Sequence, residues 1–369
     1  YMNKEIIKIV ITGGPCAGKS TGMSKLEEEL TKRGYKVLII PETATELITS
    51  GIFIGDNGLD VKNFELAILK KQIAKEKLYE EAALKMKAEK VIILCDRGAL
   101  DVKAYCSKEM FDDILQTLNM DEVTLRDEYD AIFHLKTAAD GAEKFYTLAN
   151  NAARSETLEQ ARELDSKIIK AWTGHPHFRI IDNSTDFNTK INRLLGEIFR
   201  FLGIPTPMEI ERKYLIEMPD LDYLINELEA ERIDIIQTYL KTDKENEEVR
   251  IRQRGKDGKY VYFMTTKKDV SRLTRIETEK RISYKEYLNL LMSADPELRP
   301  IRKQRYCFVY DNLYFELDIY PFWVNKAILE VELTDENQKF ELPEFIKVIK
   351  DVTEDSAYRN KSLAKSIPS

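Results

Sequence analysis

Glycines and a lysine near the N-terminus have the types and the spacing of a phosphate-binding loop. The segment that fits the pattern GxxxxGK[ST] is Gly13-Gly14-Pro15-Cys16-Ala17-Gly18-Lys19-Ser20, and Thr21 follows it. Glycines let successive backbone N–H groups converge on phosphate oxygens, because no side chain stands in the way. The Lys19 ammonium is then expected on the outer phosphates and the Ser20 hydroxyl on Mg²⁺. We therefore predict that residues 13 to 21 bind the phosphate chain of a nucleotide.

Four further side chains in the N-terminal half could take part in phosphate chemistry. Asp96 ends an apolar run and could orient Mg²⁺ through water, or it could cap the helix that follows. Glu42 could accept a proton from a substrate hydroxyl, or it could cap the next helix. Arg154 and Arg162 lie in a polar helical stretch, residues 140 to 172. This stretch could close as a lid over the transferring phosphoryl group, or it could be a solvated face with weak ion pairs.

In the C-terminal half, charged residues repeatedly occupy every second position, so each segment would present one charged face as a strand. The sets are Glu209, Glu211 and Lys213; Arg250, Arg252 and Arg254; Arg275, Glu277 and Glu279; Lys303 and Arg305; Glu316 and Asp318; Glu330 and Glu332. These faces could be solvated and crossed by ion pairs. Alternatively they line a barrel, where acids and bases must be paired or hold ions, because uncompensated buried charge is costly. The repetition favours the barrel, with carboxylates for a divalent metal and clustered bases for a phosphate chain.

The elements that must position the N-terminal residues are those of an α/β domain with a parallel sheet. Apolar runs at residues 6–12, 36–40, 91–95, 131–135 and 178–181 alternate with polar segments of helical period. Ligands bind beyond the carboxyl ends of such strands, where the glycine-rich loop, Glu42 and Asp96 fall. The amphipathic segment 191–202 leads into Gly203-Ile204-Pro205-Thr206-Pro207, which cannot continue a helix. We therefore predict one domain over residues 1–204 and a second over residues 205–369.

Composition narrows the classes of function. No run approaches the ~20 apolar residues of a membrane span, and the first residues lack the pattern of a signal peptide, so we expect a cytosolic protein. A net charge of −7 argues against a nucleic-acid coat. The four cysteines show no CxxC or Cys/His spacing, so neither structural zinc nor disulfides are expected.

The N-terminal motifs resemble those of the P-loop ATPases of AAA type that are related to the nicotinamide-riboside-kinase domain. The segments that carry the resemblance are TGGPCAGKST (residues 12–21), PETATE (41–46), CDRGALD (95–101) and HPHFRIIDNS (175–184). The resemblance implies that Asn183 and Ser184 lie beside the base or ribose of a bound ATP or GTP. The DRG form also resembles nucleoside-kinase motifs, in which Asp and Arg flank the acceptor.

The C-terminal segments resemble the CYTH superfamily, whose fold is an α+β antiparallel barrel called the triphosphate tunnel. The signature ExExK stands at residues 209–213, and VRIRQRG, RIETEKRI, FELDIY and ILEVEL follow in the family's order. The resemblance implies phosphate contacts from Lys213, Arg250, Arg252, Lys267, Arg275, Lys303 and Arg305. It implies that Glu209, Glu211, Glu277, Glu279, Asp318, Glu330 and Glu332 bind Mg²⁺ or Mn²⁺ or order those bases, and Glu211 is also expected to be catalytic.

Three functions remain open at this point. The tunnel could hydrolyse tripolyphosphate, thiamine triphosphate or a nucleotide with a divalent metal. The domain order also resembles the TRPL-translocation-defect protein family, which implies a regulatory protein that binds GTP and a phosphoinositide headgroup. A third function is phosphorylation of a small nucleoside by the first domain. We predict an enzyme, because the tunnel has a complete set of acids, whereas binding alone would need chiefly the bases.

Overall fold

The computed structural model describes residues 4–146, 157–204, 210–244, 247–271, 274–333 and 338–368; the side chains of residues 210, 269–271 and 274–276 are also outside the description. The chain divides into two compact units, Tyr1–Leu195 and Gly196–Ser369. The division falls inside helix α7 (Phe187–Phe201), upstream of the Pro/Gly connector. The domain limits at residues 204 and 205 stay a prediction.

The first unit contains a parallel sheet of five strands in the order β2-β3-β1-β4-β5. The strands are β1 (Glu5–Gly13), β2 (Lys36–Ile40), β3 (Lys90–Asp96), β4 (Ala131–Leu135) and β5 (Phe178–Ile181). Their apolar residues are buried as a near-continuous run, as expected of a sheet covered on both faces. The predicted parallel α/β fold is therefore confirmed, and β1, which leads into the glycine-rich loop, lies at the centre of the sheet.

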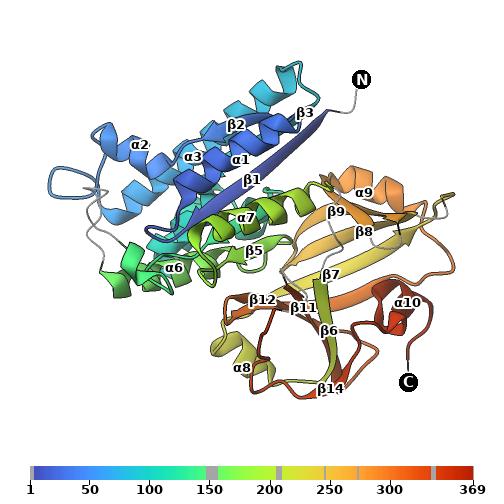
Figure 1. Cartoon of the computed structure of the whole chain (residues 1–369). Coiled ribbons are helices and arrows are strands. Elements are labelled where there is room, and N and C mark those ends of the chain that lie inside the picture. Colours follow the sequence, from blue (N-terminus) through green and yellow to red (C-terminus); the bar gives the residue numbers. More distant parts are fainter. Residues whose placement is uncertain are drawn as a thin grey trace. The chain divides into compact units, whose positions relative to one another are not determined.

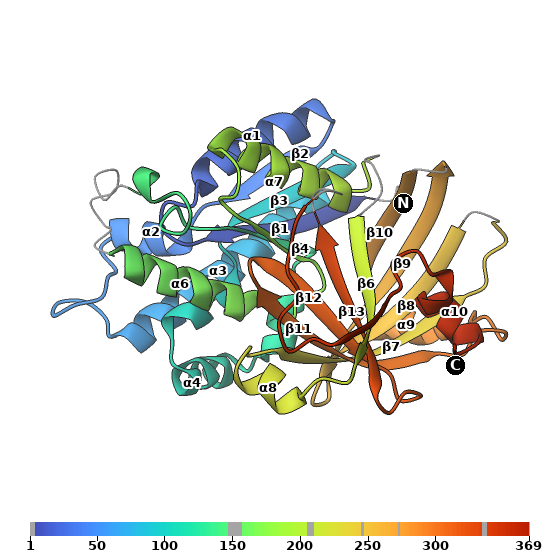
Figure 2. The ribbon, with the colours of Figure 1, turned by 60° about the horizontal axis from the view of Figure 1, so that its bottom comes forward.

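Helices cover both faces of this sheet. Figures 1 and 2 show α1 and α7 together over one face, while α3 and α6 lie over the other. The helical elements of the first unit are α1 (Lys19–Lys32), α2 (Thr43–Thr49), α3 (Val61–Lys85), η1 (Ala99–Tyr105), α4 (Lys108–Leu118), α5 (Glu122–Asp127), η2 (Glu143–Phe145), α6 (Leu158–Trp172) and α7. Among the described residues, no helix is both long enough and apolar enough to span a bilayer.

The second unit contains one antiparallel sheet of nine strands in the order β10-β9-β8-β7-β11-β12-β13-β6-β14. The strands are β6 (Ile210–Glu217), β7 (Glu231–Leu240), β8 (Glu247–Lys256), β9 (Lys259–Ser271), β10 (Thr274–Ile282), β11 (Ile301–Tyr310), β12 (Leu313–Ile319), β13 (Lys326–Leu333) and β14 (Val348–Asp351). Its helical elements are α8 (Leu221–Asn226), α9 (Tyr284–Leu291), η3 (Ser356–Tyr358) and α10 (Asn360–Lys365).

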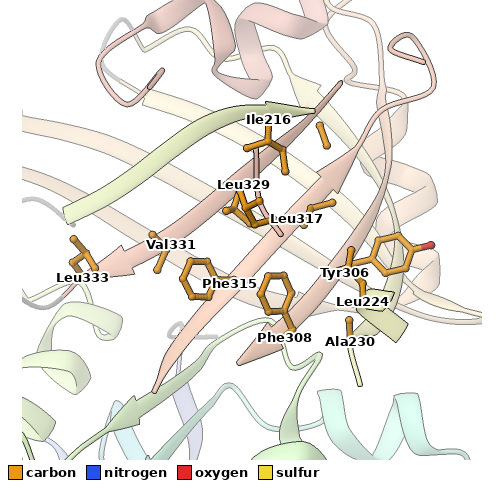
Figure 3. Packing of buried hydrophobic residues seen from close by; sticks show 12 residues of the cluster. Ile216, Leu224, Ala230, Tyr306, Phe308, Phe315, Leu317, Leu329, Val331 and Leu333 are labelled. Atoms are coloured by element: carbon orange, nitrogen blue, oxygen red, sulfur yellow. The ribbon is translucent and has the colours of Figure 1, made fainter. Parts of the chain in front are cut away.

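One face of this sheet forms the apolar core of the second unit. Phe308, Phe315, Leu329 and Val331 pack there with Leu224 of α8 (Figure 3). The rings of Phe308 and Phe315 are stacked with their centroids 5.4 Å apart. A second cluster on Ile251, Ile282 and Tyr287 packs α9 against the same side of the sheet. Helices α8 and α9 therefore pack on the apolar face of the sheet, and the alternate residues of each strand lie on the opposite face.

Two candidate phosphate-binding sites

The glycine-rich loop folds as a phosphate-binding loop requires. The φ angle of Gly13 is 155°, and a Cβ there would lie 2.2 Å from the carbonyl oxygen of Leu135. Gly18 has a φ of 89° and is the N-cap of α1, so the first-turn N–H groups of α1 open toward the loop. Both glycines are needed, because a side chain would be strained at either position.

Lys19 and Asp96 lie opposite each other at the ends of the loop and of β3. The Lys19 Nζ and Asp96 Oδ1 atoms are 4.0 Å apart. Asp96 Oδ1 is buried and accepts no hydrogen bond from any described residue, and burial raises the pKa of this carboxyl although Lys19 opposes the effect. The cap interpretation of Asp96 does not hold, because Gly98 is the N-cap of η1. Mg²⁺ prefers oxygen donors, and the Asp96 carboxylate and the Ser20 hydroxyl are of that kind, so the residues present fit that ion.

Glu42 is held by an arginine. Its Oε1 accepts from Arg97 Nε at 2.6 Å and its Oε2 from the Thr45 hydroxyl at 2.7 Å. Glu42 is the N-cap residue of α2, yet its side chain caps no described backbone N–H of the helix. Burial would raise the pKa of Glu42, but Arg97 and Lys19 lower it to about 2. So acidic a group is a weak general base, and the pairing favours a role in positioning.

The remaining residues predicted for the nucleotide site have partners within the first unit. Arg162 donates from Nε to the Ala139 carbonyl at 2.6 Å and lies 3.1 Å from Glu143. Asn183 Nδ2 donates to the carbonyl oxygens of Thr137 at 2.8 Å and Asp140 at 2.7 Å. The Ser184 hydroxyl donates to Asp182 at 2.6 Å. Their roles at a lid or a base stay predictions, and Arg154 lies outside the described residues.

In the second unit, the strand register puts the predicted charged residues on one face of the sheet. Glu211 is opposite Glu332, and Lys213 is opposite Glu330, where β6 pairs with β13. Arg305 is opposite Asp318 where β11 pairs with β12. The same alternation brings in Lys303, Arg250, Arg252, Lys267, Glu277 and Glu279, and places Arg275 in line with Glu277. The Arg275 side chain and the whole of Glu209 lie outside the described residues.

Acids and bases on this face, which we call the charged face, pair across strands. Arg305 donates to both carboxylate oxygens of Asp318 at 2.7 Å and lies 3.4 Å from Glu330. Lys213 lies 2.9 Å from Glu330 and 3.0 Å from Glu211. Lys303 also donates to Asp318, whose side chain is fully buried. These ion pairs join β6, β11, β12 and β13 into one network.

A second network joins β8, β9 and β10. Glu277 lies 2.7 Å from Lys267 and 3.3 Å from Arg250. Glu279 accepts from Arg252 and from the Thr265 hydroxyl, the latter at 2.6 Å. Burial would raise the pKa of Glu277, but Lys267 and Arg250 lower it to about 2. The carboxylates are therefore ionised and order the basic side chains around them.

Burial decides between the two interpretations of the alternation. Lys303, Arg305 and Asp318 are 5%, 8% and 0% exposed. Burial is also the largest effect on the Lys303 ammonium and, with Arg305 nearby, lowers its pKa to about 8. A solvated outer face would leave these groups in water, so the interior interpretation describes this region better.

Apolar side chains bound one end of the charged face. Leu215, Ile301 and Ile328 each stand two positions from a charged member of the face and pack with Tyr239 and Tyr320. The C-terminal segment covers this cluster through residues that include Val352, Tyr358 and Leu363. The Tyr320 hydroxyl donates to Asn360 Oδ1 at 2.8 Å. The charged face is thus bordered by an apolar cluster that the C-terminal segment covers.

Sequence reasoning placed Arg254 and Glu316 in the alternation but gave them no role. In the structure Arg254 is 2% exposed and Glu316 accepts from Arg305. It missed Thr265 and Gln237, which are uncharged and lie on the same face by register. Both residues alternate with other members of the face in the sequence, so their hydroxyl and amide groups could have been recognised as polar members of it.

The carboxylates of the charged face were predicted as metal ligands. Among the described residues, no group of three or more His, Cys, Asp or Glu side chains is arranged to hold a metal ion. Glu211 and Glu332 nevertheless lie directly opposite each other on the same face. Glu211 also pairs with Lys213. Carboxylate oxygens from two neighbouring strands are ligands that a divalent ion prefers, so this pair fits such an ion.

Comparison with known proteins agrees with the two units. The model of the AAA domain matches residues 8–190, and that of the CYTH domain matches residues 207–359. The inorganic triphosphatase of Nitrosomonas europaea is 38% identical over 165 residues, which are 43% of this chain and 99% of the relative. That of Acetivibrio thermocellus is 29% identical over 160 residues, 43% of this chain and 94% of the relative. A crystal structure of an inorganic triphosphatase is 32% identical and covers 44% of this chain and 97% of its own, with a TM-score of 0.31. The chain thus belongs to the CYTH family through its C-terminal half and carries an AAA domain of the P-loop type ahead of it.

Proposed function

We propose that the C-terminal domain hydrolyses a linear triphosphate, such as tripolyphosphate or a nucleoside or thiamine triphosphate, with Mg²⁺ or Mn²⁺. We propose further that the N-terminal domain binds ATP or GTP with Mg²⁺. The observation that carries the first proposal is the buried charged face, where seven described basic side chains come from β6, β8, β9 and β11: Lys213, Arg250, Arg252, Arg254, Lys267, Lys303 and Arg305. The 38% identity to an inorganic triphosphatase supports it.

The basic side chains suit a chain of phosphates because they extend over several strands. Arginine binds phosphate through two parallel N–H groups, and lysine adds a point charge. The carboxylates that now hold Arg252 and Arg305 would keep these side chains oriented while phosphate oxygens take the remaining N–H groups. The acids therefore preorganise the bases and lower the cost of binding.

Glu211 and Glu332 are the residues that would hold the metal ion, and the bound ion would offset phosphate charge and lower the pKa of a coordinated water. The attack forms a bond from the water oxygen to the terminal phosphorus and breaks the bond from that phosphorus to its bridging oxygen. The bases of the charged face stabilise the charge on the leaving phosphate. Tripolyphosphate would yield orthophosphate and diphosphate.

The test measures phosphate release from tripolyphosphate, ATP and GTP with Mg²⁺ or Mn²⁺. Glu211→Gln should abolish release from tripolyphosphate, while Lys19→Ala should leave it intact. Matched controls are Glu217→Gln, an exposed acid on the same strand, and Lys25→Ala, an exposed lysine on α1. No release by the unmodified protein from any of these substrates would refute hydrolysis.

Two alternatives predict other results in the same experiments. A regulatory protein would bind GTP and a phosphoinositide headgroup with little turnover. A nucleoside kinase would form ADP only when an acceptor is added, and Asp96→Asn would stop it. Arg97, which follows Asp96 in the chain, pairs with Glu42 at 2.6 Å and with Asp101 at 3.3 Å, so it would have to leave these partners to contact an acceptor. The inorganic triphosphatases among the relatives favour hydrolysis.

A further inference from the structure

Three side chains from outside the glycine-rich motif bind the backbone of the loop. The Gly14 N–H donates to Asp165 Oδ1 at 2.9 Å. The Thr137 hydroxyl donates to the Pro15 carbonyl oxygen at 2.5 Å, and Lys190 Nζ donates to that of Ala17 at 3.2 Å. Asp165, Thr137 and Lys190 are 0%, 0% and 3% exposed. They come from α6, from the segment after β4 and from α7, so three separate elements meet on one short loop.

Asp165 is built into this arrangement as an acceptor. Its Oδ1 also accepts from the Thr137 N–H at 3.0 Å and lies 3.0 Å from His134 Nε2, while Oδ2 lies 3.3 Å from Lys136 Nζ. Burial would raise the pKa of this carboxyl, but His134 and Lys136 lower it to about 2, so it is ionised. A Cβ on Gly14 would lie 2.7 Å from Oδ1, so the approach requires a glycine there.

Lys190 fixes the other end of the loop. Besides the Ala17 carbonyl, its ammonium donates to the Lys136 carbonyl at 2.8 Å and to Asn183 Oδ1 at 2.7 Å. An ammonium has three N–H donors, and these three bonds use all of them. Asn183 in turn holds two carbonyls of the segment after β4. Lys190 therefore ties the loop to the ends of β4 and β5.

A glycine-rich loop loses more backbone freedom on ordering than other segments do, and this loss costs free energy. If the loop were free, phosphate binding would bear that cost. Bonds to Gly14, Pro15 and Ala17 order the loop before the ligand arrives, which is preorganisation.

We propose that Asp165 and Lys190 are positioning residues of the nucleotide site, which hold the phosphate-binding loop in its binding conformation from outside the motif. This inference rests on the proposed binding of ATP or GTP by the first domain. It goes beyond that proposal because neither residue belongs to the motif and neither would touch the phosphates.

The test is titration of the full chain with a fluorescent ATP or GTP analogue and Mg²⁺, well below the melting temperature. Asp165→Ala and Lys190→Met should each raise Kd about 10-fold to 100-fold, which is about 1.4–2.8 kcal/mol. Asp165→Asn should raise Kd less than Asp165→Ala, because its amide oxygen still accepts from the Gly14 N–H. Glu163→Gln and Lys167→Met, exposed on the same α6, are matched controls and should bind like the unmodified protein. Tripolyphosphate hydrolysis should stay unchanged in every variant.

The inference is overturned if the folded variants bind with a Kd within twofold of the unmodified value and show only a lower melting temperature. These residues would then have a purely structural role. If Asp165→Ala does not fold, Lys190→Met decides, because it removes the bond to the Ala17 carbonyl, and an unchanged Kd for it overturns the proposal. Failure of the proposed nucleotide binding is distinguishable, because then the unmodified protein itself binds neither analogue.

Discussion

Glu65 of α3 gives a prediction whose size follows from the structure. Its side chain is buried with 4% exposure, and Oε2 has no hydrogen-bond partner among the described residues. Burial alone raises the pKa of Glu65 from 4.5 to about 7. Replacement by glutamine should therefore stabilise the first domain at high pH, where the native side chain is charged.

The sign and the size follow from linkage. Glu65 keeps its proton to a higher pH in the folded protein than in the unfolded chain. Its contribution to the free energy of unfolding is therefore fully present below about pH 4.5. It is lost as the pH rises toward 7, and it changes little above that. The difference between the two pKa values, 4.5 and about 7, corresponds to about 3 kcal/mol of unfolding free energy, which is lost in full at high pH. About 1 kcal/mol of it is already lost at pH 5, so Glu65→Gln should gain about 2–3 kcal/mol over the unmodified protein between pH 5 and 8.

The assay is urea unfolding followed by tryptophan fluorescence. The chain has two tryptophans, and Trp172, which is fully buried, belongs to the first domain. In a Trp323→Phe background the signal reports on that domain alone. Glu81→Gln, an exposed acid on the same helix, is the control. A difference between Glu65→Gln and its background that stays constant within 0.5 kcal/mol from pH 5 to 8 would refute the reasoning, because an uncharged partnerless amide costs the same at every pH.

Three further predictions concern the two sites. Burial lowers the pKa of Lys303 to about 8, so kcat/KM for tripolyphosphate should fall as the pH rises through 8, and Lys303→Arg should remove that fall in a pH–rate profile. Gly18→Ala should weaken nucleotide binding at least tenfold in a titration, because its Cβ would lie 2.6 Å from an aromatic ring, whereas Gly34→Ala, also at positive φ but in open space, should bind normally. Arg305→Met should lower the free energy of unfolding of the second domain by about 3–5 kcal/mol in urea, because the buried Asp318 loses its main partner; a loss below 1 kcal/mol would show that Asp318 is otherwise satisfied.

The fold of the first unit could be predicted from the sequence, because apolar runs and a glycine-rich loop are recognisable within short segments of the chain. The five apolar runs became β1 to β5, and α1 begins at Lys19, at the end of the glycine-rich loop. The division of the chain inside α7 could not be predicted, because the division into units depends on tertiary contacts.

The charged face was predictable to the level of strands, because alternation by two fixes which residues share a face. Pairing across strands was not, since it depends on register. Arg305 binds Asp318 from the neighbouring strand but also approaches Glu330 one strand further, and no spacing in the sequence shows this. The partners of Asn183 could not be predicted either, because its amide donates to carbonyl oxygens that lie 46 and 43 residues away in the sequence.

The ion pairs of the charged face also predict that triphosphate and metal bind together. Lys213 pairs with Glu211 and Glu330, so a polyanion arriving alone would add several negative charges beside these carboxyl groups. Burial would raise the pKa of Glu330, but Lys213 and Arg305 hold it well below its usual range, so protonation cannot remove that charge near neutral pH. Divalent cations at Glu211 and Glu332 would offset it. In calorimetry, tripolyphosphate should therefore bind at least tenfold more weakly in EDTA than with Mg²⁺, and Glu332→Gln should reduce this difference. Equal affinity with and without the metal would mean that the bases alone bind the anion, and the acids would then only order them.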